Sequence, residues 1–367
     1  HCIRHYERWW RDAEVALAKA LPDGMPLCCH DGNYLLPPGT LTSGSGGPFK
    51  IYTPFWKALQ AAMPGEPPAN APGRIDAPGK WPAGDRLADW KLLPTSPDWA
   101  KGFAVWTPGE KAARKQVLKF AGAVGDYDAT RNLPSVDGSS RLSPHLHWGE
   151  VSPAYVWRHV CDADGDSAVY RSELAWRDFA QNIIAQFPDY PEESYRDAFR
   201  RFPWRDHRRG TAQDDLEAWR RGRTGYPIVD AGMRQLWTVG WMHNRVRMIA
   251  ASFLIKHLLI DWRVGERWFW DTLVDADYGN NGVNWQWVSG SGVDSNMFSR
   301  IMAPLTQSEK FDAADYIREW VPELASLPDA AIHDPDEAGC RPEAYPAKII
   351  GHREARERAL TDYAKVK

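Results

Sequence analysis

Several short segments of this sequence combine residue types that could hold a ligand. The run Ser139-Ser140-Arg141-Leu142-Ser143 stands directly before Pro144, and proline is common at the first position of a helix. Hydroxyl groups and free backbone N–H groups beside the positive end of a helix dipole form a site for an anion such as a pyrophosphate. Simple N-capping of the helix by Ser143 is the alternative interpretation.

A carboxylate, an indole and a guanidinium are predicted to share one helix face further along the chain. Counted from Glu173, Trp176 follows at three positions and Arg177 at four, so the three side chains share one face of a helix. A partly desolvated Glu173 could stay protonated and donate a hydrogen bond to a carbonyl group. Alternatively, it stays ionised in an intrahelical ion pair with Arg177.

The segment GWMHNRVRM places an amide, a cation and a soft apolar side chain close together, as Asn244, Arg245 and Met248. A buried amide or guanidinium without a partner costs on the order of 1 to 3 kcal/mol. We therefore expect a ligand or another chain segment to satisfy these groups.

The later run DADYGNNGVNWQW combines carboxylates, amides and indoles, among them Asp275, Asp277, Asn281, Trp285 and Trp287. Its Gly and Asn residues indicate tight turns. Carboxylates could hold a metal ion, but no His lies at ligand spacing nearby, so we predict no metal site here.

Composition limits the class of protein. The 367 residues are 43% hydrophobic, which is enough for two packed domains. The sequence has neither an apolar run long enough to span a membrane nor a secretory signal pattern, so we predict a cytoplasmic protein without membrane contact. The five cysteines lack a CxxC spacing and favour neither a disulfide framework nor a zinc site.

Charge and tryptophan content are the unusual features. The formal net charge is only −3, yet residues 196–267 hold fifteen Lys or Arg against eight Asp or Glu. Such a block can bind phosphates, or it can be a solvated face of Arg-rich helices. The twenty tryptophans could fill the core, but indoles also stack on bases and flavins and give up an electron readily.

The order of local signals predicts an α/β segment followed by a helical domain. The chain begins with His1 rather than Met and opens directly in a helical pattern, so we expect the N-terminal end of an α/β domain to be missing. Ten of the twenty-one residues in 64–84 are Pro or Gly, which predicts an irregular linker. Helix starts are indicated at Ser152-Pro153 and Tyr226-Pro227.

We therefore divide the chain into three parts. Residues 1–63 are predicted to be the C-terminal part of the α/β domain, residues 64–106 the interdomain linker, and residues 107–367 an all-helical domain.

Five segments in the same order resemble the cryptochrome/photolyase family, and in detail its members that repair cyclobutane pyrimidine dimers in DNA. They are SSRLSPHLHWGEVSP, SELAWRDF, GRTGYPIVDAGMRQLWTVGWMHNRVRM, SFLIKHLLIDWR and GNNGVNWQW. The resemblance implies a Rossmann-like antenna domain, truncated here, and a large all-helical domain that binds FAD in a U-shaped conformation.

The resemblance also assigns residues to the flavin. The phosphates and ribityl chain would be held by Tyr127, Ser139, Ser140, Arg141, Leu142 and Ser143, with Tyr170 nearby. The isoalloxazine would be lined by Arg247, Asp275, Ala276 and Asp277. Asn281 falls where photolyases place an Asn facing the flavin N5, a position that plant cryptochromes fill with Asp. This favours repair over signalling.

For ultraviolet-damaged DNA, the resemblance implies a dimer flipped out of the duplex, because enzymes that act on bases must reach them. The lesion pocket would be formed by Glu173, Trp176, Asn244, Met248 and Trp287. Neighbouring phosphates would be contacted by Arg131, Arg177, Arg245 and Arg300. Glu173 would hydrogen-bond the dimer and stabilise its radical anion, and the two indoles would replace lost stacking, at roughly 1 to 3 kcal/mol per base.

The implied reaction uses light. Excited, fully reduced flavin would give an electron to the dimer, the cyclobutane bonds would break, and the electron would return. Trp285, Trp262 and Trp204 would carry electrons between flavin and surface during photoreduction. The loop SNMFSRIMAPLTQ departs from the family's more frequent APYFRIFNP.

Other functions remain as alternatives. A cryptochrome-like photoreceptor would use the same groups to signal, but only seven residues follow HREARERAL, so we expect no C-terminal signalling extension. Repair of the (6-4) photoproduct depends in animal enzymes on a His in the HNRVRM region, whereas Asn244 and Met248 favour the cyclobutane dimer. A Trp-rich scaffold without cofactor would be colourless. We expect a monomer. The resemblance implies that the truncated N-terminal domain is where the family binds an antenna chromophore, either a folate or a deazaflavin, and this chromophore stays unassigned here.

Overall fold

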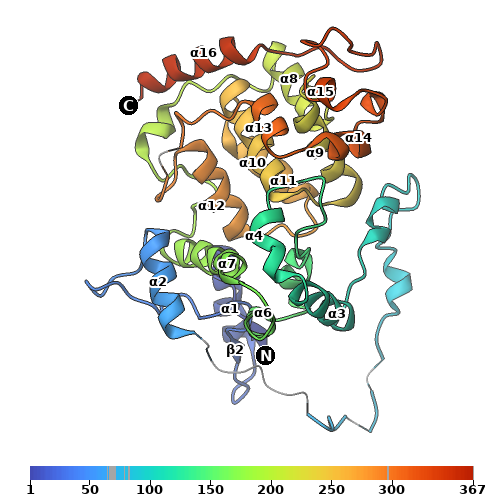
Figure 1. Cartoon of the computed structure of the whole chain (residues 1–367). Coiled ribbons are helices and arrows are strands. Elements are labelled where there is room, and N and C mark those ends of the chain that lie inside the picture. Colours follow the sequence, from blue (N-terminus) through green and yellow to red (C-terminus); the bar gives the residue numbers. More distant parts are fainter. Residues whose placement is uncertain (64, 66–71, 78, 82, 296, 367) are drawn as a thin grey trace.

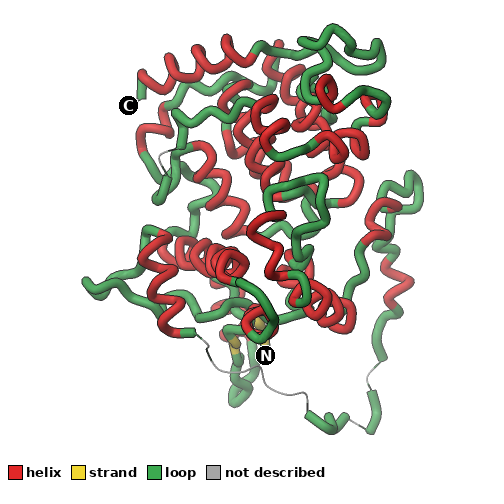
Figure 2. Tube along the Cα trace, in the orientation of Figure 1, coloured by secondary structure: helices red, strands yellow, loops and turns green. Residues whose placement is uncertain are grey.

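The computed structural model describes residues 1–367 except 64, 66–71, 78, 82, 296 and 367. Helices dominate the described part of the chain, and its strands are two short ones close to the N-terminus (Figures 1 and 2). This confirms the predicted class, an α/β beginning followed by a large helical part.

The beginning of the chain forms a small parallel sheet with a helix between its strands. Cys2 pairs with Cys29 and Ile3 with His30. The elements of this part are β1 (Cys2–Ile3), α1 (Arg8–Ala20), β2 (Cys29–His30) and α2 (Tyr52–Ala62).

Part of the predicted linker, residues 64–106, falls on positions that the structure does not describe. Our domain boundaries remain predictions. Its described part includes the 3-10 helices η1 (Leu87–Trp90) and η2 (Lys101–Val105). Next to η2, the Trp106 indole Nε1 donates to the Val239 carbonyl oxygen at 2.7 Å. This end of the linker therefore lies against the helical domain.

The helical domain consists of many short helices and one long one. In chain order its elements are α3 (Glu110–Ala121), η3 (Val124–Asp126), α4 (Tyr127–Thr130), α5 (Ser143–His147), α6 (Pro153–Cys161), α7 (Ala168–Gln186), η4 (Asp197–Arg201), α8 (Gly210–Arg220), α9 (Pro227–Val239), α10 (Asn244–Ser252), the π-helical turn η5 (Phe253–His257), α11 (Trp262–Thr272), α12 (Tyr278–Ser289), α13 (Pro304–Lys310), α14 (Ala314–Trp320), η6 (Pro322–Leu324), α15 (Asp329–Ile332) and α16 (His352–Ala364).

The long helix α7 joins the N-terminal part to the helical domain. Asp178 is buried and its Oδ1 accepts hydrogen bonds from the backbone N–H groups of Leu35 and Leu36, at 2.8 and 3.0 Å. Asn182 donates to the Phe49 carbonyl oxygen at 2.7 Å. These polar side chains fix the segment before α2 against α7, so the N-terminal part can contribute to a site on the other face of that helix.

Two hydrophobic cores meet at α12, which lies between the two halves of the molecule in Figure 1. Val283 belongs to the core around α2, α6 and α7, whereas Trp285 and Val288 belong to the core around α8 to α11. A helix that borders both cores is well placed to line a cavity between them.

In the described part of the chain, no helix is both long and apolar enough to cross a membrane.

Candidate functional site

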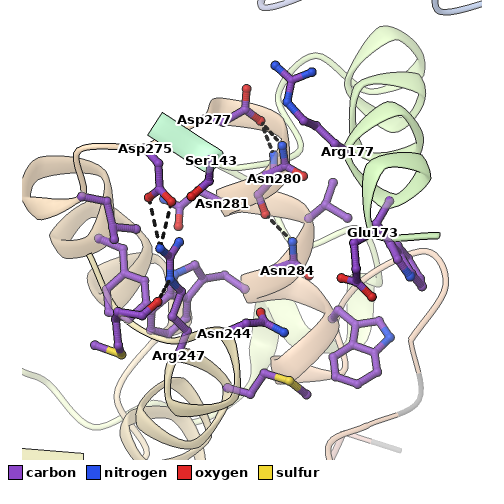
Figure 3. A pocket seen from close by; sticks show the side chains of 18 of the residues that line it. Ser143, Glu173, Arg177, Asn244, Arg247, Asp275, Asp277, Asn280, Asn281 and Asn284 are labelled. Atoms are coloured by element: carbon purple, nitrogen blue, oxygen red, sulfur yellow. Dashed lines mark hydrogen bonds and ion pairs between the residues drawn. The ribbon is translucent and has the colours of Figure 1, made fainter. Parts of the chain in front are cut away.

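A cavity of about 560 Å³ opens between α4, α5, α7, α10 and α12 (Figure 3). This volume lies in the range of cofactor and ligand sites, roughly 300–1,000 Å³. Segments far apart in the sequence meet here. The predicted residues that line it are Tyr127, Arg131, Ser139, Ser140, Arg141, Leu142, Ser143, Tyr170, Glu173, Trp176, Arg177, Asn244, Arg245, Arg247, Met248, Asp275, Ala276, Asp277, Asn281, Trp285 and Trp287.

One wall of the cavity is suited to a phosphate group. Arg141 has a left-handed backbone, with φ of 49°, and Leu142 follows in the right-handed helical region. Successive residues of opposite hand turn their backbone N–H groups toward a common concavity that binds anions. Ser140 is held beside it, because its Oγ accepts from the Leu142 N–H at 3.3 Å and from the Tyr170 hydroxyl at 3.1 Å.

The alternative that Ser143 caps a helix is wrong. Helix α5 begins at Ser143 itself, its N-cap residue is Leu142, and the cap has no side-chain hydrogen bond. The Ser143 hydroxyl is thus not engaged as a cap, and it faces the cavity, as Figure 3 shows.

A buried ion pair lies near this wall. Arg247 donates through Nη2 to both oxygens of Asp275, at 3.2 and 2.9 Å, and through Nε to the Met242 carbonyl oxygen at 2.7 Å. The Asp275 side chain is almost fully buried. Figure 3 shows the pair on the same side of the cavity as Asn281. A fixed, planar guanidinium in such a place suits the polar edge of a ring system.

Asn281 has a defined orientation. Its Nδ2 donates to the backbone carbonyl oxygen of Glu266 at 2.9 Å and to the Glu266 carboxylate at 2.8 Å. Both amide hydrogens are thereby used, and Oδ1 is the polar atom left for a donor in the cavity. Burial raises the pKa of Glu266 to about 7, although the hydrogen bond from Asn281 acts in the opposite direction.

Asp277 caps the next helix. Its Oδ1 accepts from the Asn280 backbone N–H at 2.6 Å and from the Asn280 amide at 2.8 Å. One carboxylate of the acidic run is thus a helix cap and the other, Asp275, an ion-pair partner.

The opposite end of the cavity carries Glu173, and here the predicted partner is wrong. Glu173 does not pair with Arg177 on its own helix. It pairs with Arg131, which follows α4, at 2.7 Å. A partner from a distant segment has replaced the local one.

Arg177 has different contacts. Its Nη1 donates to the Asn33 carbonyl oxygen and its Nη2 to the Leu146 carbonyl oxygen, the latter at 3.2 Å. The guanidinium also lies 5.3 Å from the centre of the Tyr34 ring. In Figure 3 the guanidinium points away from Glu173. These contacts use two of the terminal nitrogens of the guanidinium within the protein, and the phosphate contact that we expected for Arg177 stays a prediction.

No pattern in the sequence indicated the partner of Trp176. The Tyr52 ring stacks on this indole with 3.5 Å between ring centres and 6° between planes. Tyr52 also donates its hydroxyl to the Ser172 carbonyl oxygen at 2.7 Å. The N-terminal part thus supports the end of the cavity that carries Glu173 and Trp176. This contact joins residues more than one hundred positions apart, which no local pattern could reveal.

Positive charges gather around Arg245, and we refer to Arg131, Arg245 and Arg300 together as the cavity mouth. Burial lowers the pKa of Arg245, and the charges of Arg131 and Arg300 lower it further. Arg245 is held by Asn132, whose Oδ1 accepts from Nη2 at 2.6 Å. Cations that repel one another in this way favour the approach of a polyanion.

Most cations of the basic block 196–267 do not line the cavity. Only Arg245 and Arg247 of its cations line the cavity. Many others are in ion pairs elsewhere, including Arg200 with Glu193, Arg205 with Asp215, Arg208 and Arg209 with Asp206, and Arg234 with Glu323. Many cations of the block thus have a carboxylate partner within the protein, and phosphate binding by the block stays a prediction.

The three predicted electron carriers lie at different depths. Trp285 lines the cavity and is 3% exposed. Trp262 at the start of α11 is fully buried, and its Nε1 donates to Ser194 Oγ at 3.1 Å. Trp204 is partly exposed and lines a hollow on another part of the protein. Trp262 and Trp204 do not line the cavity. The same is true of Arg300, which we predicted to contact DNA.

A group of potential metal ligands lies outside the cavity. Cys2, Glu14 and Cys29 bring their ligand atoms within 4.8 Å of one another, with the two sulfur atoms 3.5 Å apart. Cysteine spacing along the chain did not reveal it, because the parallel pairing of β1 and β2 joins residues that are 27 positions apart.

Fold and cavity together define a largely helical protein with a cavity lined by segments that lie far apart in the sequence. Residues 170–365 match the family described as the FAD binding domain of DNA photolyase, and residues 1–73 match the family described as DNA photolyase. The chain belongs to the DNA photolyase family, and it contains that family's FAD-binding domain.

Relatives agree with this assignment. A deoxyribodipyrimidine photo-lyase of Agrobacterium fabrum is 47% identical over 384 residues, which cover 99% of this chain and 79% of the relative. The crystal structure of a class III photolyase from Agrobacterium tumefaciens superposes with a TM-score of 0.93 at 47% identity, covering 99% of this chain and 78% of that one. A Synechocystis cryptochrome structure gives a TM-score of 0.83 at 28% identity, covering 98% and 78%.

Proposed function

We propose that this chain repairs cyclobutane pyrimidine dimers in ultraviolet-damaged DNA with light as the energy source, as a deoxyribodipyrimidine photo-lyase. The observation that carries the proposal is the shared cavity. It joins a flavin end, with Asn281, Arg247 and Asp275, to a lesion end, with Glu173 and Trp176.

The residues present fit FAD. The concavity at Arg141 and the nearby serine hydroxyls would bind its phosphates, and the Arg247–Asp275 pair would lie along the isoalloxazine. Because Asn281 Oδ1 can only accept, it would prefer an N–H group at the flavin N5 to a bare nitrogen. FAD, when bound in its fully reduced form, supplies the light-excited electron that opens the cyclobutane ring.

The lesion end would hold the flipped dimer. Trp176, fixed by Tyr52, and Trp287 would stack against it, and Glu173 would hydrogen-bond it while paired with Arg131. Arg131, Arg245 and Arg300 would contact the phosphates on either side. The dimer would return the electron after its bonds break, so the reaction has no net redox change. The protein walls would exclude water from the exchange.

Trp285, Trp262 and Trp204 would supply electrons to oxidised flavin before repair. Trp285 lines the cavity, Trp262 is fully buried, and Trp204 lines a hollow on another part of the protein, which supports this order. We also propose that the protein acts as a monomer and in the cytoplasm.

A comparison of substrates tests the proposal. The purified protein with reduced flavin is illuminated with one oligonucleotide that carries a cyclobutane dimer and another that carries a (6-4) photoproduct. We expect only the first lesion to disappear. Repair of the second alone would favour the (6-4) alternative, and repair of neither would favour a photoreceptor.

A further inference from the structure

The loop that follows α12 borders the lesion end of the cavity, and it is fastened at several points. Asp294 and Ser295 line the cavity. Asp294 Oδ2 accepts from the Tyr52 backbone N–H at 2.9 Å, and Ser295 Oγ donates to the Trp287 carbonyl oxygen at 2.6 Å. These bonds fix the first part of the loop but leave its far end, which carries Arg300, to other contacts.

The far end is a tight turn with an aromatic anchor. The Arg300 backbone N–H donates to the Met297 carbonyl oxygen at 3.0 Å. Inside the turn, Phe298 is fully buried, with its ring 4.7 Å from that of Tyr363 and 5.0 Å from that of Phe202. Gly290, at φ of 79°, allows this approach, because a Cβ there would stand 2.7 Å from the Phe298 nitrogen.

Lys256 holds this turn through two hydrogen bonds to its backbone. The residue belongs to the π-helical turn η5 and is only 1% exposed. Its Nζ donates to the Met297 carbonyl oxygen at 2.8 Å and to the Arg300 carbonyl oxygen at 2.9 Å. No carboxylate in the described part of the chain forms an ion pair with it. A buried ammonium without a counter-charge is costly, and π-helical turns are frequent at functional sites.

We propose that Lys256 is a positioning residue for DNA recognition, which holds the turn 297–300 so that Arg300 stands with Arg131 and Arg245 at the cavity mouth. Lys256 touches neither flavin nor lesion and acts through the backbone of the loop. The inference rests on the proposed function, because it assigns this mouth to DNA phosphates.

The charges around Lys256 link it to the same mouth. Burial lowers the pKa of Lys256 to about 7, and the Arg300 charge lowers it further in the same direction. His257 neighbours it on η5, and Arg358 of α16 donates to the His257 carbonyl oxygen. Of these groups, Arg300 is the one that a DNA phosphate would neutralise. Bound DNA would therefore favour the protonated form of Lys256, whose charge-assisted hydrogen bonds to the two carbonyl oxygens of the loop are the stronger ones.

The test uses the flavin-loaded protein and a duplex that carries one thymine dimer. Lys256→Met keeps most of the side-chain volume and removes the ammonium. We expect its dissociation constant to rise about tenfold and the slope of log affinity against log salt to fall by about 1. Flavin content and repair at saturating DNA should change little. Lys115→Met, which removes an exposed lysine on α3, is the control for charge alone.

A double variant separates positioning from general weakening. If Lys256 acts through Arg300, then K256M/R300Q should bind no more weakly than R300Q alone. Wild-type affinity in K256M, or losses that add in the double variant, would overturn the inference. Wild-type repair in the same assays would show that the proposed function itself still holds.

If K256M does not fold, the pH dependence of DNA binding by the wild-type protein tests the inference instead. Its affinity for the dimer duplex should fall as pH rises through about 7, where Lys256 loses its proton. R300Q should lose most of this dependence. Identical pH profiles for the two proteins would contradict the proposed link.

Discussion

Asn281 donates both hydrogens of its side-chain amide to Glu266, one to the backbone carbonyl and one to the carboxylate, at 2.9 and 2.8 Å. This relationship decides which atom Asn281 offers to the cavity. With both hydrogens engaged, the amide cannot rotate to present a donor without losing two hydrogen bonds, and a charge-assisted bond contributes about 1.5–3 kcal/mol.

Removing the Glu266 carboxylate should therefore weaken the preference for reduced flavin. In Glu266→Ala, the amide keeps one of its two partners and can turn. We expect reduced flavin to reoxidise in the dark about tenfold faster, measured by the return of flavin absorbance in air. Glu266→Gln keeps an acceptor oxygen at the same place and should stay close to wild type. Equal rates in all three proteins would contradict the orienting role.

Glu173 should matter for repair and not for flavin binding. Glu173→Gln keeps the size of the side chain but removes the ion pair with Arg131. We expect repair per absorbed photon at saturating DNA to fall about tenfold, since a charge-assisted contact is lost. Glu217→Gln, which breaks an exposed pair with Arg221, is the matched control. Full repair by Glu173→Gln would show that Glu173 is not part of the lesion site.

The tryptophan assignment predicts a separation of photoreduction from repair. In Trp262→Phe, the buried indole and its bond to Ser194 are lost, while most of the volume is kept. Photoreduction of oxidised flavin should slow by at least about tenfold, whereas repair with chemically reduced flavin should persist. Trp157→Phe, a buried indole in the other core, should photoreduce normally. Normal photoreduction in Trp262→Phe would remove this residue from the electron path.

Asp178 predicts how stability varies with pH. Burial raises its pKa to about 7, from 3.8 in the unfolded chain, although its bonds from Leu36 and Leu35 oppose this. The folded state thus holds the proton more tightly than the unfolded state. The contribution to stability is full below pH 3.8 and is lost as pH rises through about 7.

The melting temperature of the wild type should accordingly fall between pH 6 and pH 8.5. Asp178→Asn cannot ionise and still offers Oδ1 to the two N–H groups. We expect it to lose less stability than the wild type over this interval, by about 1 kcal/mol, because only about one pH unit separates pH 6 from the pKa of about 7. Parallel pH profiles would mean that Asp178 is already ionised in the folded protein at pH 6.

The helices and the cavity residues could largely be predicted, because each rests on a local signal. Ser152 caps α6 through its Oγ, which accepts from the Tyr155 N–H at 3.2 Å, and α9 begins at Pro227, where Tyr226-Pro227 indicated a start. The cavity residues lie within short motifs that keep their order along the chain.

The partners of these residues could not be predicted, because they come from distant segments. Spacing favoured Arg177 for Glu173, but the fold brings Arg131 to it and uses Arg177 to hold the Asn33 carbonyl. Spacing likewise gave no sign that Glu266 orients Asn281. Tertiary packing decides such pairs after local structure has formed.

Light-driven repair is the central claim, and one measurement tests it most directly. The purified flavoprotein is reduced, mixed with an oligonucleotide that carries one thymine dimer, and illuminated with blue or near-ultraviolet light beside a dark control. We predict that thymine absorbance returns only in the light, and that the return is slower in variants of Asn281 or Glu173. No return despite bound, photoreducible FAD would contradict the account and point to a photoreceptor or another lesion.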